Sequence, residues 1–141
     1  MQERKISLIL ESHIFLVIES IYIEGTRKTP SISLDPKGII KIEGRSIPED
    51  AELFFRDLIF WMDEYVASGT TSTRIDLSFE YLNSGTSKIV LQVLKALKDL
   101  GASGHQLAVN WYFEEGDDDI LERGEYYASI LDIKINFIEV E

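Results

Sequence analysis

Residues 73–101 read TRIDLSFEYLNSGTSKIVLQVLKALKDLG, which joins a strand pattern directly to a helix pattern. Apolar and polar residues alternate from Thr73 to Phe79, as is typical of a β-strand with one buried face. From about Thr86, apolar residues recur at three- and four-residue steps until Gly101, which predicts an amphipathic helix. The residues between these patterns are expected to form a short loop. A strand followed at once by a helix indicates an α/β domain.

The same alternation continues on both sides of this unit. The other predicted strands are residues 21–24, 31–34, 39–43, 106–113 and 134–140. The other predicted helices are residues 44–67 and 118–130. The turn Asp35-Pro36-Lys37-Gly38 predicts a hairpin, and strand–helix–strand order implies parallel pairing through right-handed crossovers. We therefore predict one small α/β domain: a mixed, mostly parallel sheet with an N-terminal hairpin, covered by about three main helices.

The predicted helix 44–67 has a start signal and an inward face. Ser46 and Glu49 have the S-x-x-E spacing of a capping box, which predicts the N-terminus at this point. Six apolar residues at helical spacing are expected to face the core: Leu53, Phe54, Leu58, Trp61, Met62 and Tyr65.

Composition excludes several classes of protein. The chain has 141 residues, 25 acidic against 14 basic, and a net charge of −11, which argues against nucleic acid or an anionic membrane as the main partner. It contains no cysteine, so disulfides, thiolate nucleophiles and cysteine metal sites are ruled out. Polar residues interrupt the apolar segment 6–23, and no signal-peptide pattern is present, so we expect a soluble cytoplasmic protein without membrane insertion.

Residues suited to catalysis are scarce. His13 and His105 are the only histidines, and neither has a second histidine at ligand spacing. No nucleophile elbow, phosphate-binding loop or dinucleotide fingerprint is present. Both histidines are therefore interpreted as surface or partly buried residues without a catalytic role.

One acidic run allows three interpretations. Its carboxylates are Glu114, Glu115, Asp117, Asp118 and Asp119. They suit Mg²⁺ or Ca²⁺, although the EF-hand pattern is missing. They also suit the start of the third helix, where the helix dipole stabilises negative charge, or a patch for a basic partner. The metal interpretation is the competing functional hypothesis: an acid-rich metal-dependent enzyme or metal-binding protein centred on residues 114–119.

The turn at residues 81–88 carries hydroxyl groups beside the first turn of a helix. A phosphoryl group is favoured there, because free N–H groups and the helix dipole attract anions. Ordinary N-capping by Ser84 or Thr86 explains the same residues.

Several segments together resemble one family. They are Thr29–Asp35, Ile42–Glu49, Leu77–Ser84 with Ser87-Lys88, Asn110–Glu115 with Asp117–Asp119, and Gly124-Glu125. In this order they resemble the SiaC-like regulatory phosphoproteins, long catalogued only as a bacterial domain of unknown function. The resemblance spans residues 21–141 and implies a fold similar to the STAS domain of anti-sigma-factor antagonists. Residues 1–20 form an N-terminal extension outside it, as an extra strand, a dimer arm or an unmatched leader.

The resemblance implies a function in signalling. Such proteins are non-enzymatic and need no cofactor: a protein kinase phosphorylates one hydroxyl at the strand–helix turn, and a PP2C-type phosphatase removes the phosphate. The unphosphorylated form binds and activates a target, for the best-understood members a diguanylate cyclase that controls cyclic-di-GMP and biofilm formation.

The phosphate acceptor of the family aligns with Ser84, while Thr86 offers a second hydroxyl nearby and Gly85 replaces a serine of the family motif. Lys88 is a candidate counter-charge for the phosphate. The candidate partner-binding residues are Asn83, Ser84, Gly85, Thr86, Ser87, Lys88, Glu114, Glu115, Asp117, Asp118 and Asp119.

Overall fold

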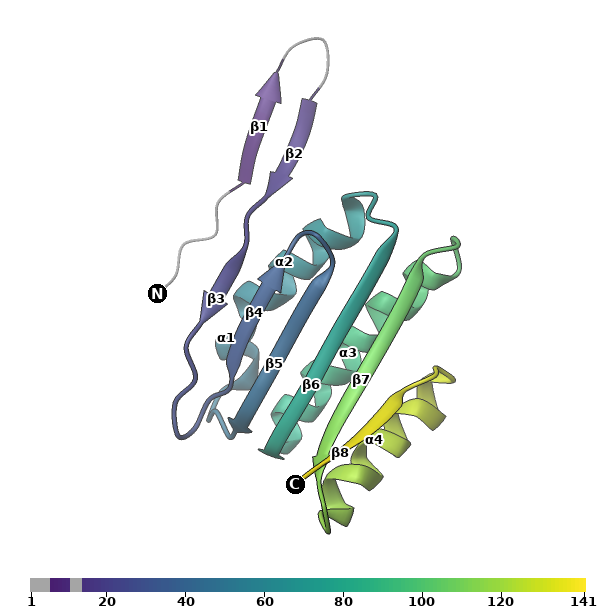
Figure 1. The fold of residues 1–141 in the computed structure, drawn as a ribbon. Helices are drawn as coiled ribbons and strands as arrows, with labels where there is room; N and C mark the ends of the chain where they lie inside the picture. The colour runs from purple at the N-terminus through teal and green to yellow at the C-terminus, as the bar shows by residue number, and fades with distance from the viewer. Residues whose placement is uncertain (1–5, 11–13) are drawn as a thin grey trace.

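The computed structural model describes residues 6–10 and 14–141 (Figure 1). The strands are β1 (Ile6–Leu10), β2 (Ile14–Ile18), β3 (Ile21–Ile23), β4 (Ser31–Asp35), β5 (Ile39–Ser46), β6 (Ser72–Leu82), β7 (Gln106–Glu114) and β8 (Asn136–Val140). The helices are α1 (Ala51–Phe54), α2 (Arg56–Ala67), α3 (Ser84–Gly101) and α4 (Asp118–Leu131). β1 and β2 form a separate antiparallel hairpin that extends beyond the main sheet.

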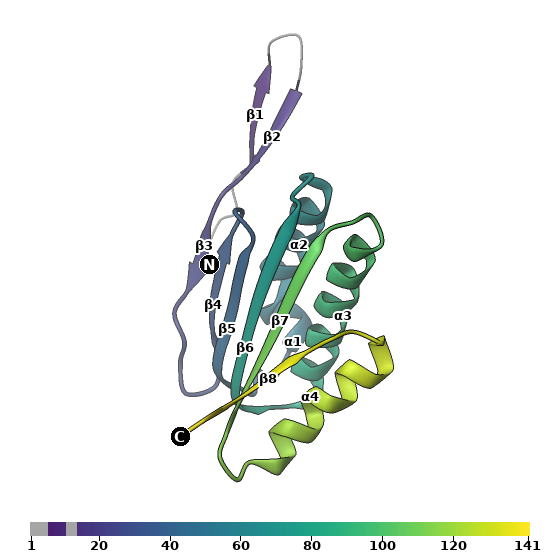
Figure 2. The ribbon, with the colours of Figure 1, turned by 45° about the vertical axis from the view of Figure 1, so that its right-hand side comes forward.

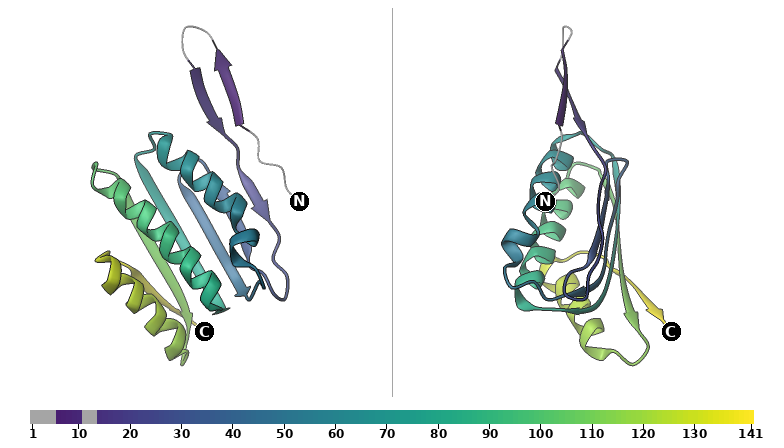
Figure 3. Two further views of the ribbon diagram at one scale, coloured as in Figure 1. Left: turned by 180° about the vertical axis from the view of Figure 1, so that it is seen from behind. Right: turned by 90° about the vertical axis from the view of Figure 1, so that its left-hand side faces the viewer.

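The main sheet has six strands in the order β3-β4-β5-β6-β7-β8. The pairs β3–β4 and β4–β5 are antiparallel, whereas β5–β6, β6–β7 and β7–β8 are parallel. All four helices lie on one face of this sheet (Figures 2 and 3). The predicted α/β class, with a mostly parallel sheet and an antiparallel hairpin near its start, is confirmed.

The hairpin turn between β4 and β5 has the predicted chemistry. Gly38 N donates to Asp35 O at 2.9 Å, and the Asp35 carboxylate accepts from Lys37 N at 2.9 Å. Gly38 has φ +108°, and a Cβ atom there would lie only 2.3 Å from the carbonyl oxygen of Ser72. A side chain is excluded at this position, because both the backbone conformation and the close approach of Ser72 require glycine.

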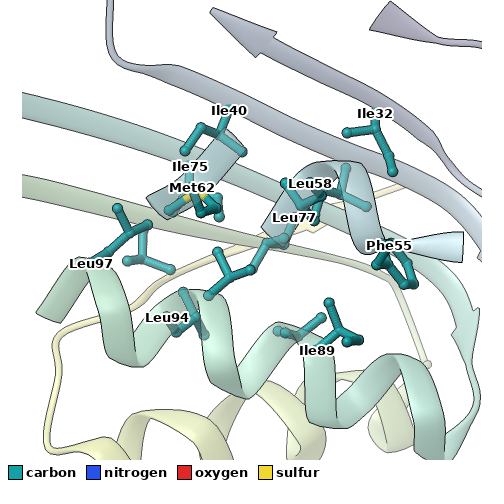
Figure 4. Packing of buried hydrophobic residues seen from close by; sticks show 14 of the residues in the cluster. Ile32, Ile40, Phe55, Leu58, Met62, Ile75, Leu77, Ile89, Leu94 and Leu97 are labelled. Atoms are coloured by element: carbon teal, nitrogen blue, oxygen red, sulfur yellow. The ribbon is translucent and has the colours of Figure 1, made fainter. Parts of the chain in front are cut away.

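The hydrophobic core lies between the helices and the covered face of the sheet (Figure 4). Ile75, Leu77 and Phe79 of β6 are all buried, as their alternation predicts. The predicted inward face of α3 is also buried and consists of Ile89, Val90, Val93, Leu94 and Leu97. Packing of these residues fixes α3 against the sheet, and with it the turn that begins this helix.

The predicted start of the first helix is wrong. Ser46 ends β5, paired with Leu82 of β6, and is fully buried. The N-cap is Asp50, whose carboxylate accepts a hydrogen bond from Leu53 N at 3.1 Å. The capping-box pattern misled because parallel pairing with β6 extends β5 as far as Ser46.

The single helix expected at residues 44–67 is interrupted at Phe55, which separates α1 from α2. Phe55 is 1% exposed and faces the core, whereas Leu53 is 59% exposed. The expectation that Leu53 faces the core is therefore wrong. Leu58, Trp61, Met62 and Tyr65 are buried as predicted.

The face of the sheet without helices carries a row of polar side chains. Lys41, Asp76, Asn110 and Asn136 are aligned in register across β5, β6, β7 and β8. Asn110 Nδ2 donates to Asp76 Oδ1 at 2.8 Å, and Asn136 Nδ2 donates to Asn110 Oδ1 at 3.0 Å. We call these four residues the polar ladder.

The segment before β3 is joined to the domain at two points. Ile18 is buried in the core, and the indole of Trp61 donates to the carbonyl oxygen of Glu19 at 2.9 Å. His13 lies outside the described residues. Among the residues that the structure describes, none of the helices has the length and hydropathy of a membrane span.

Candidate functional site

The turn between β6 and α3 lies at the carboxyl edge of the parallel strands (Figure 1). Asn83 is the N-cap of α3, because its side-chain oxygen accepts a hydrogen bond from Thr86 N at 2.9 Å. The same side chain donates from Nδ2 to the carbonyl oxygen of Pro48 at 3.0 Å. Capping by Ser84 or Thr86 is therefore wrong, since Asn83 has the extended backbone and the short polar side chain that an N-cap needs.

The two candidate acceptor hydroxyls have opposite environments. Thr86 is fully buried, and its Oγ1 lies 2.7 Å from Ser46 Oγ, so the two hydroxyls share a hydrogen bond. Ser84 is exposed at the first position of the helix. An enzyme that modifies this turn in its folded state thus meets the hydroxyl of Ser84 at the surface and finds that of Thr86 enclosed.

Gly85 brings α3 into close contact with α1. A Cβ atom at Gly85 would lie 2.9 Å from the Cβ atom of Ala51, closer than real Cβ contacts. The serine that the family resemblance implies at this position would therefore require a wider separation of the two helices. Glycine at position 85 is explained by this helix contact.

A groove of about 800 Å³ runs between the α1–α2 side and α3. Gly85, Lys88 and Ile89 form part of one wall, and the other wall includes Arg56, Ile59 and Phe60. The Phe60 ring is 48% exposed. The predicted site residues Gly85 and Lys88 thus line a partly apolar groove that starts beside Ser84.

The acidic run lies at the same edge, in the turn between β7 and α4. Asp117 is the N-cap of α4, and its Oδ1 accepts from Ile120 N at 3.1 Å. Asp118 and Asp119 are exposed in the first turn, where the helix dipole stabilises negative charge. No group of three or more metal-ligating side chains occurs in the described ranges. The run is therefore explained as the start of a helix.

Three side chains connect α3 with α4 behind these two turns. Ser87 Oγ lies 2.5 Å from Tyr127 Oη and accepts a hydrogen bond from an Arg123 guanidinium nitrogen at 2.9 Å. Sequence reasoning missed both Arg123 and Tyr127. Their four-residue spacing on the predicted third helix was the available signal, since it places them on one helix face.

Burial raises the pKa of Tyr127 above its usual value of 10.0, although the hydrogen bond to Ser87 and the charge of Arg123 partly oppose this. The phenol consequently remains protonated and available as a donor at neutral pH.

His105 has structural partners away from this edge. Its Nε2 lies 2.6 Å from Thr73 Oγ1, and its Nδ1 lies 2.9 Å from the carbonyl oxygen of Thr70. Thr73 is in turn hydrogen-bonded to Tyr65 Oη at 2.5 Å. These bonds tie the start of β6 to the loop before β7.

Fold and site together define a small α/β domain whose exposed hydroxyl, groove and acidic turn share one edge of the sheet. The family model of the SiaC family regulatory phosphoproteins matches residues 23–140, so the chain belongs to that family.

Similar proteins come from Pseudomonas aeruginosa. An uncharacterized protein of strain UCBPP-PA14 is 26% identical over 111 residues, which are 78% of this chain and 88% of the relative. Apo-SiaC of P. aeruginosa has a similar structure, with a TM-score of 0.76 and 25% identity over 88% of this chain and 100% of that one. A chain in the crystal structure of the diguanylate cyclase SiaD in complex with its activator SiaC gives a TM-score of 0.80 and 24% identity, over 85% and 99%.

Proposed function

We propose that this chain is a non-enzymatic, cytoplasmic partner-switching protein controlled by phosphorylation of Ser84. The unphosphorylated form binds and activates a diguanylate cyclase, and a protein kinase and a PP2C-type phosphatase set the balance between the two forms. The observation that carries the proposal is the exposure of Ser84 in a capped strand–helix turn, in a chain that belongs to a family of regulatory phosphoproteins.

The modification is chemically simple. The kinase transfers the γ-phosphoryl group of ATP to Ser84 Oγ, releasing ADP and the hydroxyl proton. The phosphatase returns the hydroxyl by hydrolysis and releases inorganic phosphate. The phosphate adds about −1.5 to −2 charge at neutral pH. Since the chain already carries a net charge of −11, its effect must be local.

The groove beside Ser84 supports a role in target binding. Its apolar side chains, Ile59, Phe60 and Ile89, can bury apolar groups of a partner, and Lys88 lies one helical turn from Ser84. A phosphate at Ser84 places negative charge and bulk at the mouth of this groove. Together with the carboxylates at residues 114–119, of which all but the half-buried Asp117 are exposed, the groove forms the proposed partner surface.

Intact-mass analysis after incubation with the cognate kinase and ATP tests the modification. We expect one phosphate on the parent chain and none on Ser84→Ala. Ser103→Ala, which removes an exposed hydroxyl outside the turn, is the control and is expected to gain one phosphate. An unmodified parent chain, or a phosphate that persists in Ser84→Ala, would show the proposal to be wrong.

Target binding is tested with a purified diguanylate cyclase from the same organism. Phe60→Ser is expected to weaken binding at least about tenfold, since exposed aromatic side chains often dominate interfaces. Tyr126→Ser is the matched control, because Tyr126 is similarly exposed at 57% but lies on α4 outside the groove. Equal affinities of the two variants would exclude the groove as the binding surface.

A further inference from the structure

The exposed Ser84 and the partly buried Ser87 lie on the same side of the first turns of α3. Residues three apart on a helix have Cβ atoms about 5–6 Å from each other. The Arg123 guanidinium, which comes from α4, donates to Ser87 Oγ at 2.9 Å. A cation from a different helix is therefore held about one helical turn from the proposed phosphate acceptor.

Arg123 now donates to a neutral hydroxyl. Guanidinium groups bind phosphate oxygens through two parallel hydrogen bonds in which both partners are charged, whereas Ser87 Oγ offers Arg123 a single neutral acceptor. A phosphate on Ser84 would thus be a better acceptor than Ser87 Oγ. Tyr127 Oη lies 2.5 Å from the same hydroxyl, so Ser87 keeps a partner if Arg123 turns away.

Lys88 is a second cation near Ser84, four residues along the helix, and Arg56 lies across the groove that Lys88 lines. It is exposed and lines the groove together with the carboxylates Glu49 and Asp50. An ammonium group is a compact point charge on a flexible stem, without the planar fork that matches phosphate. Arg123 is more restricted, because its guanidinium is already hydrogen-bonded between the two helices.

We propose that Arg123 is the residue that binds the phosphate on Ser84, exchanging its bond to Ser87 for bonds to the phosphate oxygens. This inference rests on the proposed phosphorylation of Ser84. The exchange moves a side chain of α4, the helix that begins with the acidic residues Asp118 and Asp119.

The test uses phosphoserine inserted at position 84 during translation, so it needs no kinase. The second ionisation of the phosphate, with a pKa of about 6 in an unperturbed phosphoserine, is followed by phosphorus NMR as pH is varied. We expect the midpoint to be higher by about half a pH unit or more in Arg123→Gln than in the parent, because a neighbouring cation favours the dianion. Arg123→Lys should lie between them.

Each variant changes one cation and leaves the other charged groups of the groove and of α4 in place, so a difference in midpoint reports on that cation. Glu49, Asp50 and Arg56 in the groove, and Asp119 and Glu122 on α4, are unchanged throughout. Lys88→Gln is expected to raise the midpoint less than Arg123→Gln does. Arg74→Gln is the matched control, because Arg74 lies at the opposite end of β6 and should leave the midpoint unchanged.

The proposal is overturned if Arg123→Gln titrates with the parent midpoint, or if Lys88→Gln has an equal or larger effect. If Arg123→Gln does not fold, Arg123→Lys tests the proposal instead. Lysine lacks the planar guanidinium that binds two phosphate oxygens, so the midpoint of the phosphate titration must still rise. Failure of the proposed function would be seen separately, as a Ser84 that the cognate kinase does not modify.

Discussion

The buried hydroxyl pair of Ser46 and Thr86 joins the end of β5 to the first turn of α3. Thr86→Val leaves Ser46 Oγ without this partner, so we expect the free energy of unfolding to fall by about 1–3 kcal/mol. Ser46→Ala combined with Thr86→Val should cost less than the sum of the two single substitutions, because no polar group is then left unpaired. Urea denaturation measures the free energy of unfolding of the two single variants and the double variant. Strictly additive losses would contradict a coupling between the two hydroxyls.

Gly85 is required by the contact between α1 and α3. Alanine in place of glycine normally stabilises a helix by about 0.5–1 kcal/mol, but at position 85 we expect a net loss of stability because the new Cβ overlaps Ala51. Gly101→Ala, where no atom lies within 4 Å, is the control and should not destabilise. Thermal unfolding measures the loss. Adding Ala51→Gly to the Gly85→Ala chain should reduce the loss of stability, because it removes the Cβ atom that the new side chain meets. An unchanged loss would refute the steric explanation.

Predictions for single residues succeeded where neighbours in the sequence determine the role of the residue. They failed where a strand distant in the sequence determines it. The S-x-x-E spacing at Ser46 and Glu49 predicted a cap, yet Ser46 belongs to β5 because of its pairing with β6. Likewise, the choice between Ser84 and Thr86 depends on Ser46, which lies 40 residues from Thr86. Local pattern carries no information about such a contact.

At the scale of elements, the link between α3 and α4 depends on the protonated phenol of Tyr127. Its folded-state pKa is raised, so above about pH 10 the unfolded chain loses this proton more readily than the folded chain does. Stability is therefore expected to fall as pH rises through 10, and Tyr127→Phe should make this fall less steep. Urea denaturation of both proteins between pH 8 and about pH 11 tests the sign. If the unfolding free energies of the two proteins changed with pH in parallel, the raised pKa of Tyr127 would be contradicted.

The order of elements was predictable, whereas their mutual contacts were not. Alternation in β6 and three- and four-residue spacing in α3 predicted a strand and a helix that the structure confirms. The break at Phe55 was missed because residues 44–67 show one uninterrupted apolar periodicity. At Phe55 the backbone departs from helical geometry, with φ −91° and ψ 8°, while its side chain is buried in the core.

For the whole molecule, the N-terminal hairpin should be dispensable for folding. β1 and β2 pair with each other and not with the six-stranded sheet. Removal of residues 1–17 is expected to leave the far-ultraviolet circular dichroism of the domain recognisable and to lower the melting temperature by no more than about 5 °C. Removal of residues 1–20 should lower the melting temperature further, because buried Ile18 and the Glu19 carbonyl that accepts from the Trp61 indole are lost. Equal losses, or an unfolded 18–141 chain, would contradict this boundary.

The polar ladder has a consequence for how the strands find their alignment during folding. A slip by one residue is penalised by the apolar core, because it turns every buried side chain to the other face. A slip by two residues keeps the faces and merely exchanges aliphatic side chains such as Ile75 and Leu77. It would, however, take Asp76 out of line with Asn110. Hydrogen bonds on the open face therefore distinguish the native alignment from its nearest misfolded alternative.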